Sequence, residues 1–362
     1  MKSSIRLPLP LWSLAIPPAA CALLAALWGG ELGSVLLALT GATLIASVLV
    51  AVFHAEIIAH RLGEPFGTLV LAMAVTIIEV SLIVSMMLSN GPGVDALARD
   101  TVFATVMIIC NGVIGICLLT GAIRHHTIAF RVDGSSSALS VLVALTVLTL
   151  VLPEFTTTTP GPTYSPSQLA FAGVSSLLLY GVFVFVQTVR HRDQFLPVSL
   201  PGTDEEHPHP SATQAGMAVI LLFIALIAVV GLAKLLAPTI QSGVAAIGAP
   251  PGVVGIAIAL MVLLPETVAA MRAAANNRMQ TSLNLALGSA LATIGLSIPA
   301  VAVAAHLLGT PLKLGLPAKE IVLLMVTLLI SAITLAGGRA TVLHGAVHLV
   351  LFGAFIHLSI VP

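Results

Sequence analysis

The sequence predicts an all-α polytopic membrane protein with about eleven transmembrane helices, and its composition carries most of that prediction. Hydrophobic residues make up 58% of the 362 residues, and charged residues only 8%. The mean hydropathy is +1.12. A typical soluble domain carries roughly 25% charged residues, so a soluble enzyme and a disordered chain are both excluded. Basic and acidic residues number 14 each, which leaves no basic excess for binding nucleic acid.

Apolar runs define the expected helices. A helix needs about 20 apolar residues to cross the hydrocarbon core. On that criterion the candidate spans are 11–28, 33–54, 66–89, 101–122, 138–153, 168–189, 214–237, 249–270, 281–308, 320–337 and 341–361. The first run could be mistaken for a signal peptide, but Pro17 and Pro18 interrupt its apolar core, so an uncleaved span is favoured. The longest run contains Pro299, which predicts a kink.

The Lys and Arg residues predict how the chain is oriented in the membrane. If the N-terminus is cytoplasmic, ten of them fall on the cytoplasmic side. The far side then receives only four, namely Arg99, Lys234, Lys313 and Lys319. Because cytoplasmic loops carry the basic excess, we expect the N-terminus inside. An odd number of spans then places the C-terminus outside.

A polar stretch at 190–213 divides the chain into two halves. It contains acidic and histidine residues and is expected to be a cytoplasmic linker, either a solvated connector or a regulatory, cation-sensing loop. The remaining segments are an extra N-terminal helix (1–30), a first five-helix repeat (31–189) and a second five-helix repeat (214–362). Five is odd, so two such repeats would enter the membrane in opposite orientations, as in many secondary transporters.

Two acidic residues lie inside apolar runs, whereas all the others fall in loops or at span ends. Glu79 and Glu266 each occupy the second span of a five-span half. An ionised carboxylate in hydrocarbon costs at least ~2.5–3.5 kcal/mol. Two of them at corresponding positions predict one shared cation or proton site at the repeat interface. The alternative is a protonated pair that holds helices together.

Small and polar residues near the two acids could complete such a site. They are Thr76, one turn before the first acid, Asn111 in the next span, and Ser289 and Thr293 in the corresponding span of the second half. Pro265 directly precedes Glu266 and frees a backbone carbonyl one turn back, so a broken helix there could aim carbonyl oxygens at a cation. Each polar residue could instead hydrogen-bond neighbouring helices.

The ligand types predict which ion would bind. Hard oxygen ligands, without a thiolate or paired imidazoles, suit Ca²⁺ or Na⁺ rather than Zn²⁺ or Cu⁺. The three cysteines form no CxxC pair. Two carboxylates neutralise one Ca²⁺, and two protons neutralise the same two carboxylates. The charge balance therefore suggests, as a hypothesis, exchange of two protons for one Ca²⁺.

Two sequence motifs resemble a known family. The first half contains His60-Arg-Leu-Gly-Glu-Pro-Phe-Gly67 followed by Thr76-Ile-Ile-Glu79-Val-Ser-Leu-Ile83. The second half contains Leu264-Pro-Glu266 followed by Asn276-Asn-Arg-Met-Gln-Thr-Ser-Leu-Asn-Leu-Ala-Leu-Gly-Ser289-Ala. These motifs resemble the two repeats of ChaA-type bacterial Ca²⁺(Na⁺)/H⁺ antiporters, in the CAX branch of the calcium/cation antiporter superfamily. The resemblance covers nearly the whole chain.

This resemblance implies a function and a set of site residues. It implies secondary-active export of Ca²⁺, with Na⁺ and K⁺ as further candidates, in exchange for protons across the bacterial inner membrane. It assigns the essential acids to Glu79 and Glu266, and the small-polar motifs to Asn111 with Gly115 and to Ser289 with Thr293. No cofactor is implied, since the cation is the transported substrate.

Other interpretations of the sequence are weaker. His344 and His348 share a helix face and could bind a metal, but without a third ligand of the HExxH kind, hydrogen bonding between helices is favoured. An intramembrane enzyme would need a catalytic motif, and the chain has no Walker loop, GxSxG or HExxH. An inverted-repeat transporter of another, organic solute would need an aromatic pocket, yet aromatic residues make up only 4%.

Overall fold

The computed structural model describes residues 9–29, 33–62, 66–88, 93–196, 210–246 and 248–361, with the backbone alone for 66–72. Within these ranges, nine helices are long and apolar enough to cross a membrane, and two shorter apolar helices accompany them. The eleven correspond one to one with the runs expected from the sequence. The fold class predicted from the composition is therefore confirmed.

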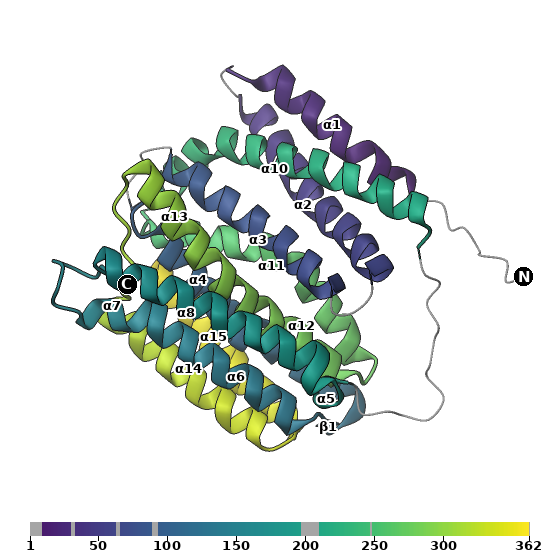
Figure 1. Ribbon diagram of the computed structural model, residues 1–362, viewed down its shortest axis with the longest axis vertical. Coiled ribbons are helices and arrows are strands. Elements are labelled where there is room, and N and C mark those ends of the chain that lie inside the picture. The colour runs from purple at the N-terminus through teal and green to yellow at the C-terminus, as the bar shows by residue number, and fades with distance from the viewer. Residues whose placement is uncertain are drawn as a thin grey trace, which may run out of the picture. The chain divides into compact units, whose positions relative to one another are not determined.

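The described residues form two compact units, each of which draws on both halves of the chain. The first unit contains α1 (Leu11–Leu27), α2 (Ser34–Leu62), α3 (Phe66–Met87) and most of α10 (Ala212–Ala246). Helix α1 packs against α2 and α10 (Figure 1). Its Cys21 thiol donates a hydrogen bond to the Ile224 carbonyl oxygen, and the Lys234 ammonium lies 5.4 Å from the centre of the Trp28 ring.

Pro17 explains a second contact within the first unit. Proline has no backbone N–H, so the carbonyl oxygen of Ser13, one turn earlier in α1, has no intrahelical donor. His54 of α2 supplies one, because its Nε2 lies 2.9 Å from the Ser13 oxygen. A carbonyl can only accept, so Nε2 carries the hydrogen.

The second unit contains the remaining helices and a two-residue ladder. Its first-half elements are α4 (Leu97–Met107), η1 (Ile108–Val113), α5 (Ile114–His125), β1 (Ile128–Ala129), α6 (Val132–Thr146), η2 (Val147–Val151), α7 (Leu152–Phe155), α8 (Pro166–Phe185), η3 (Val186–Arg190) and α9 (Arg192–Phe195). Its second-half elements are α11 (Gly252–Ala275), α12 (Met279–Ala292), η4 (Thr293–Ser297), α13 (Ile298–Leu308), α14 (Ala318–Ala336), β2 (Arg339–Ala340) and α15 (Val342–Ile360). Strands β1 and β2 pair antiparallel, with Ile128 opposite Ala340.

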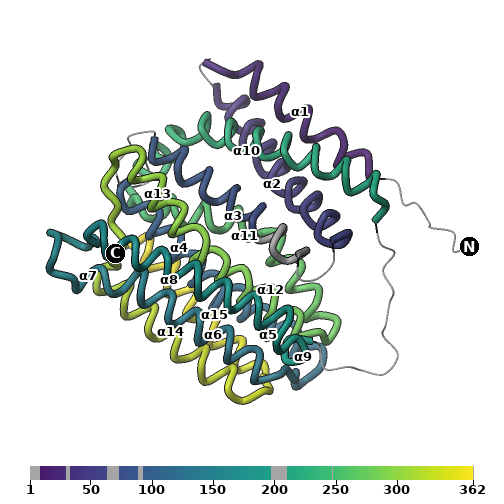
Figure 2. Tube along the Cα trace, in the orientation of Figure 1, coloured from purple at the N-terminus to yellow at the C-terminus, as the bar shows by residue number. Residues whose placement is uncertain are grey.

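The third span of each five-helix repeat, α4–η1–α5 in the first and α12–η4–α13 in the second, contains a π-helical turn. Each of these two turns packs against a helix of the other half. In the first half, η1 packs against α15, the fifth span of the second half. In the second half, η4 packs against α8, the fifth span of the first half. Figure 2 shows α14, α6 and α8 running alongside one another in this unit, as their packing requires. Each half thus completes the packing of the other.

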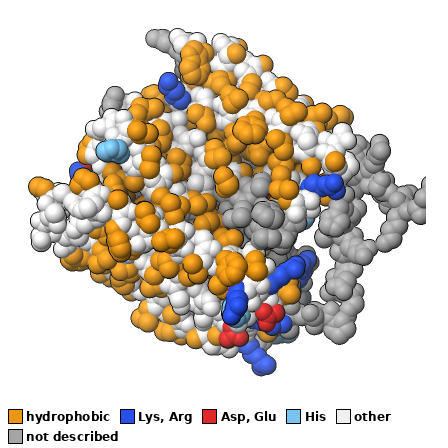
Figure 3. All heavy atoms as spheres, in the orientation of Figure 1, with side chains coloured by type: hydrophobic (Ala, Val, Ile, Leu, Met, Phe, Trp, Pro, Cys, Tyr) orange, Lys and Arg blue, Asp and Glu red, His pale blue; other side chains and the backbone are white. Residues whose placement is uncertain are grey.

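The surface of the second unit fits a bilayer. Large apolar side chains such as Leu178 and Leu307 are exposed, and hydrophobic side chains cover the face seen in Figure 3. Charged side chains gather at the end of the unit where α5 and α9 lie (Figures 1, 2 and 3). An apolar band between polar ends is the arrangement that a membrane-spanning bundle needs.

Some helix ends and one kink differ from the sequence expectation. Helix α2 continues to Leu62 and α11 to Ala275, beyond the expected ends at residues 54 and 270, because the residues that follow each apolar run are mostly good helix formers such as Ala, Glu and Arg. In the long ninth span, the irregularity takes the form of the π-helical turn Thr293–Ser297, which ends two residues before Pro299.

Candidate functional site

Glu79 lies in the first unit, past the middle of α3. It is thirteen residues after Phe66 and eight before Met87, or about 20 Å and 12 Å at 1.5 Å per residue. Only 1% of its surface is exposed, and Ile78, Leu82 and Ile83 beside it in sequence are buried apolar residues. A carboxyl group in such surroundings is stable only when it is protonated, hydrogen-bonded or neutralised by a cation.

Glu266 lies in the second unit at the corresponding place in α11. It is fourteen residues after Gly252 and nine before Ala275, so the spacing from both helix ends is nearly the same as for Glu79. Its side chain is partly buried. The expected helix break at Pro265 is absent, because α11 continues from Gly252 to Ala275. Pro265 still removes one backbone donor, that for the Met261 carbonyl.

Ser289 lies at the same level of the second unit as Glu266. Helices α11 and α12 pack as a hairpin around residues 276–278, and Ser289 is ten residues after the first residue of α12. Both side chains therefore lie about 14–15 Å from the turn, close to half of the roughly 30 Å hydrocarbon thickness. The Ser289 hydroxyl is buried and has no hydrogen-bond partner among the described residues, which makes it available to a ligand.

The remaining predicted ligands have different surroundings. Thr76 is partly buried on α3, three residues before Glu79. Thr293 is buried at the start of η4, one turn after Ser289. Asn111 is buried in η1, but its side chain hydrogen-bonds Thr327 of α14 and His348 of α15. The Ser289 hydroxyl thus has no partner among the described residues, whereas the Asn111 amide is already hydrogen-bonded.

The π-helical turns are the feature of this region that sequence reasoning did not find. Such turns frequently occur at functional sites, and η1 and η4 contain Asn111 and Thr293 respectively. Glycines in or just after these turns let the spans approach their neighbours. A Cβ atom on Gly115 would lie 3.0 Å from His348 Cβ, and one on Gly295 would lie 2.6 Å from Tyr180 Cβ. Gly115 is therefore needed for close helix packing.

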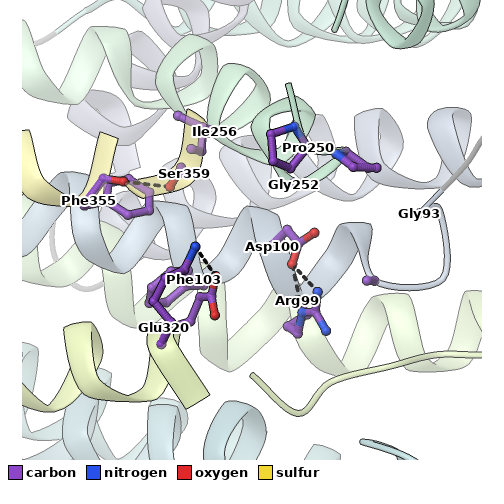
Figure 4. A pocket seen from close by; sticks show the side chains of 13 residues that line it. Gly93, Arg99, Asp100, Phe103, Pro250, Gly252, Ile256, Glu320, Phe355 and Ser359 are labelled. Carbon is purple, nitrogen blue, oxygen red and sulfur yellow. Dashed lines mark hydrogen bonds and ion pairs between the residues drawn. The ribbon is translucent and has the colours of Figure 1, made fainter. Parts of the chain in front are cut away.

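A separate cavity of about 330 Å³ lies at one end of the second unit (Figure 4). Arg99 and Asp100 of α4 form an ion pair of 2.7 Å there, beside Gly252 at the start of α11. Lys319 and Glu320 of α14 form a second pair of 3.3 Å. The two ion pairs contain equal positive and negative charge, and all four residues lie at span ends as the sequence predicted. The cavity therefore lies at a different depth along α11 from Glu266.

Parts of the predicted site and linker lie outside the described residues. Glu64 of the first motif is one of them. Most of the acidic and histidine residues of the 190–213 linker are others, namely Asp204, Glu205, Glu206, His207 and His209. The described part of the linker forms the end of η3, the short helix α9 and the start of α10.

Comparison with known proteins decides the family. The model of the family described as "Sodium/calcium exchanger protein" matches residues 32–189 and 217–361. The chain belongs to the sodium/calcium exchanger family. The two matched stretches lie one on each side of the linker, so each half of this exchanger carries the family pattern. The family is one of transporters, which excludes the enzyme alternative.

Individual relatives agree with the family. The exchanger is 47% identical over 372 residues to the y4hA protein of Sinorhizobium fredii, with all of both chains covered. It is 36% identical over 324 residues to the sodium-potassium/proton antiporter ChaA of Escherichia coli, covering 89% of this chain and 87% of ChaA. The structure of the H⁺/Ca²⁺ exchanger CAX matches its fold with a TM-score of 0.73 at 14% identity, over 96% of this chain and 87% of CAX.

Proposed function

We propose that this chain is a cation/proton antiporter that exports Ca²⁺, or alternatively Na⁺ or K⁺, in exchange for protons. The observation that carries the proposal is the pair of carboxyl groups, Glu79 and Glu266, at corresponding places in two apolar helices. An acid at that depth is expensive unless it serves an ion or proton pathway. The relationship to the antiporter ChaA supports the same reaction.

In the proposed cycle, the two glutamates carry either protons or a cation. Two protons make both carboxyl groups neutral, and one divalent cation neutralises both carboxylates. Thr76, Ser289 and Thr293 would supply neutral oxygen ligands, which hard cations prefer. The unloaded, doubly charged state is costly in an apolar environment. This cost disfavours a change of access without cargo, which makes the exchange of cation for protons obligatory.

Alternating access would arise from the two five-helix repeats, with one side of the membrane reached at a time. The basic residues of the second unit favour one orientation. Among its described residues, seven Arg lie at the end of the unit that contains the turn between α11 and α12, namely Arg124, Arg131, Arg190, Arg192, Arg272, Arg278 and Arg339. The opposite end holds three basic residues, Arg99, Lys313 and Lys319. By the positive-inside rule, the first end faces the cytoplasm.

The proposal is tested by proton-gradient dissipation in everted membrane vesicles. Ca²⁺, Na⁺ and K⁺ are added separately to wild type, Glu79→Gln and Glu266→Gln. We expect at least one cation to dissipate the gradient in the wild type, and neither variant to respond. Glu154→Gln is the matched control, because it makes the same chemical change at an exposed carboxyl group and should behave as the wild type does.

Two outcomes would overturn the proposal. A folded, inserted wild type that responds to none of the three cations would favour a carrier of another solute. Variants that retain the full response would remove the glutamates from the mechanism. A second measurement concerns the protons directly: cation binding to purified protein should strengthen as the pH rises from about 6 to 9, because protons and cation compete for the same carboxylates.

A further inference from the structure

A buried chain of hydrogen bonds joins three spans of the second unit. His348 of α15 and Asn111 of η1 are both completely buried, and His348 Nδ1 lies 3.3 Å from Asn111 Oδ1. On one side, the Thr334 hydroxyl of α14 lies 3.1 Å from His348 Nε2. On the other side, Asn111 Nδ2 donates to the Thr327 hydroxyl of α14 at 2.8 Å. The four polar side chains thus satisfy one another away from water.

The hydrogen bonds of this chain can be assigned in a single direction, each group donating to the next. Because Asn111 Nδ2 donates to Thr327, its Oδ1 is the acceptor that faces His348. His348 Nδ1 therefore carries a hydrogen, and a neutral His348 would accept from the Thr334 hydroxyl through Nε2. Thr327 in turn donates to the sulfur of Met107 at 3.4 Å. In the neutral form of His348, these bonds select a single tautomer, with the hydrogen on Nδ1.

This arrangement is unsuited to conducting protons. A relay needs groups that gain and lose protons at both ends, but one end here is a thioether and an amide interrupts the middle. These hydrogen bonds instead hold the π-helical turn η1 in one position. Asn111 lies in the π-helical turn η1, and its side chain ties that turn to α14 and α15. The glycines Gly112 and Gly115 let α15 approach closely enough for these bonds to form.

The position of η1 matters for Glu266. The continuous α4–η1–α5 span packs along α11, the helix that carries Glu266. A shift in the π-helical turn would therefore move the surface against which α11 lies. The corresponding turn η4 of the second half packs with Tyr180 of α8 at Gly295, a contact through the aromatic side chain. The hydrogen-bonded polar side chains are thus found at η1, whereas η4 is held by an aromatic contact.

We propose that His348, acting through Asn111, is a positioning residue for cation binding. It holds the π-helical turn so that α11 presents Glu266 in the binding geometry. This inference rests on the proposed antiporter function. It also gives Asn111 a role other than that of the cation ligand expected from the sequence.

The test measures the cation concentration for half-maximal proton-gradient dissipation, in wild type and variants that are shown to be folded and inserted. We expect His348→Leu to raise this KM about tenfold, as loss of an outer-shell partner often does, with a smaller change in maximal rate. His348→Asn keeps a donor near the Nδ1 position and should recover most of the affinity. His357→Leu is the control, since His357 is exposed on the same helix.

A double-variant comparison separates positioning from direct binding. If His348 acts through Asn111, His348→Leu and Asn111→Leu together should raise the KM no more than either change alone. Independent, multiplying effects would mean that His348 does not act through Asn111 and would overturn the inference. A wild-type KM in folded His348→Leu would also overturn it.

Two further results keep the test decisive. If His348→Leu does not fold, Thr334→Val removes only the outer donor at nearly constant volume, and an unchanged KM there would count against the inference. A wild type without any cation response would instead refute the antiporter function. Failure of the function and failure of the positioning role are therefore distinguishable.

Discussion

Gly255 of α11 lies directly against the backbone of Thr101 of α4, so that a Cβ atom on Gly255 would fall 2.8 Å from the Thr101 amide nitrogen. No side-chain rotation can relieve a clash with a backbone atom. Any side chain at this position must therefore push α11 away from α4. Because α11 also carries Glu266, close packing at Gly255 contributes to where that carboxyl group lies within the second unit.

Gly255→Ala should accordingly lower the stability of the protein by about 1–3 kcal/mol, the usual cost of overpacking. Thermal unfolding in detergent measures the effect as a lower Tm. The matched control is Gly353→Ala on α15, where an added Cβ would meet nothing within 4 Å. Equal Tm values for the two variants would show that the α4–α11 contact tolerates a side chain.

The contact between α1 and α2 predicts that a second substitution can restore the stability lost by the first. His54→Phe removes the Nε2 donor that serves the Ser13 carbonyl, and a buried carbonyl left without a donor costs about 1–3 kcal/mol. Pro17→Ala restores a backbone N–H one turn after Ser13. We therefore expect the double variant to regain a large part of the Tm lost in His54→Phe.

The same pair of substitutions also shows how the prediction could fail. If the loss in His54→Phe came only from poor packing of the new ring, Pro17→Ala would not correct it. The energies of the two single variants would then simply add, as for independent sites. A clear non-additive gain in Tm is the result that supports the hydrogen-bond explanation.

Ser289→Ala tests whether the buried hydroxyl beside the level of Glu266 serves the transported cation. The hydroxyl has no partner among the described residues, so its removal should leave the Tm nearly unchanged. Loss of one oxygen ligand should raise the KM for the cation about fivefold, equivalent to ~1 kcal/mol. Ser140→Ala, which changes an exposed serine on α6, is the control, and an unchanged KM for Ser289→Ala would remove Ser289 from the site.

The ion pair at the end of α4 should respond in a characteristic way to single and double changes. Arg99 and Asp100 are largely shielded from water, with 14% and 18% of their side chains exposed. Removing one partner leaves a poorly solvated charge, whereas removing both does not. Arg99→Gln or Asp100→Asn should therefore lower the Tm more than the two changes together, and a double variant less stable than both singles would contradict this.

The spans and the two intramembrane acids could be predicted because they depend on composition alone. An apolar run of sufficient length has to cross the membrane, and a carboxyl group inside it stands out, as at Glu79 and Glu266. Helix ends were harder, because α2 continues to Leu62 through polar residues. Such residues are compatible with helix and only stop the apolar run.

The π-helical turns and the role of Asn111 could not be predicted from local sequence. They depend on partners far away in the chain: Asn111 and His348 are 237 residues apart. An asparagine in an apolar span indicates a polar contact, but its spacing does not say whether the partner is a cation or another helix. The pairing of His344 with His348 was similarly ambiguous. His344 forms a local cap with Thr341, and only His348 reaches across to other spans.

The crossed packing of η1 against α15 has a consequence for how the protein is made. The third span of the first half inserts into the membrane long before α15 has been synthesised. Until then, the Asn111 amide and the glycine surface of that span lack their native partners. The first half therefore reaches its final structure only after the second half has been inserted. A ribosome that stalls before α15 would leave an exposed polar amide in the bilayer, which is the kind of feature that membrane quality control can recognise.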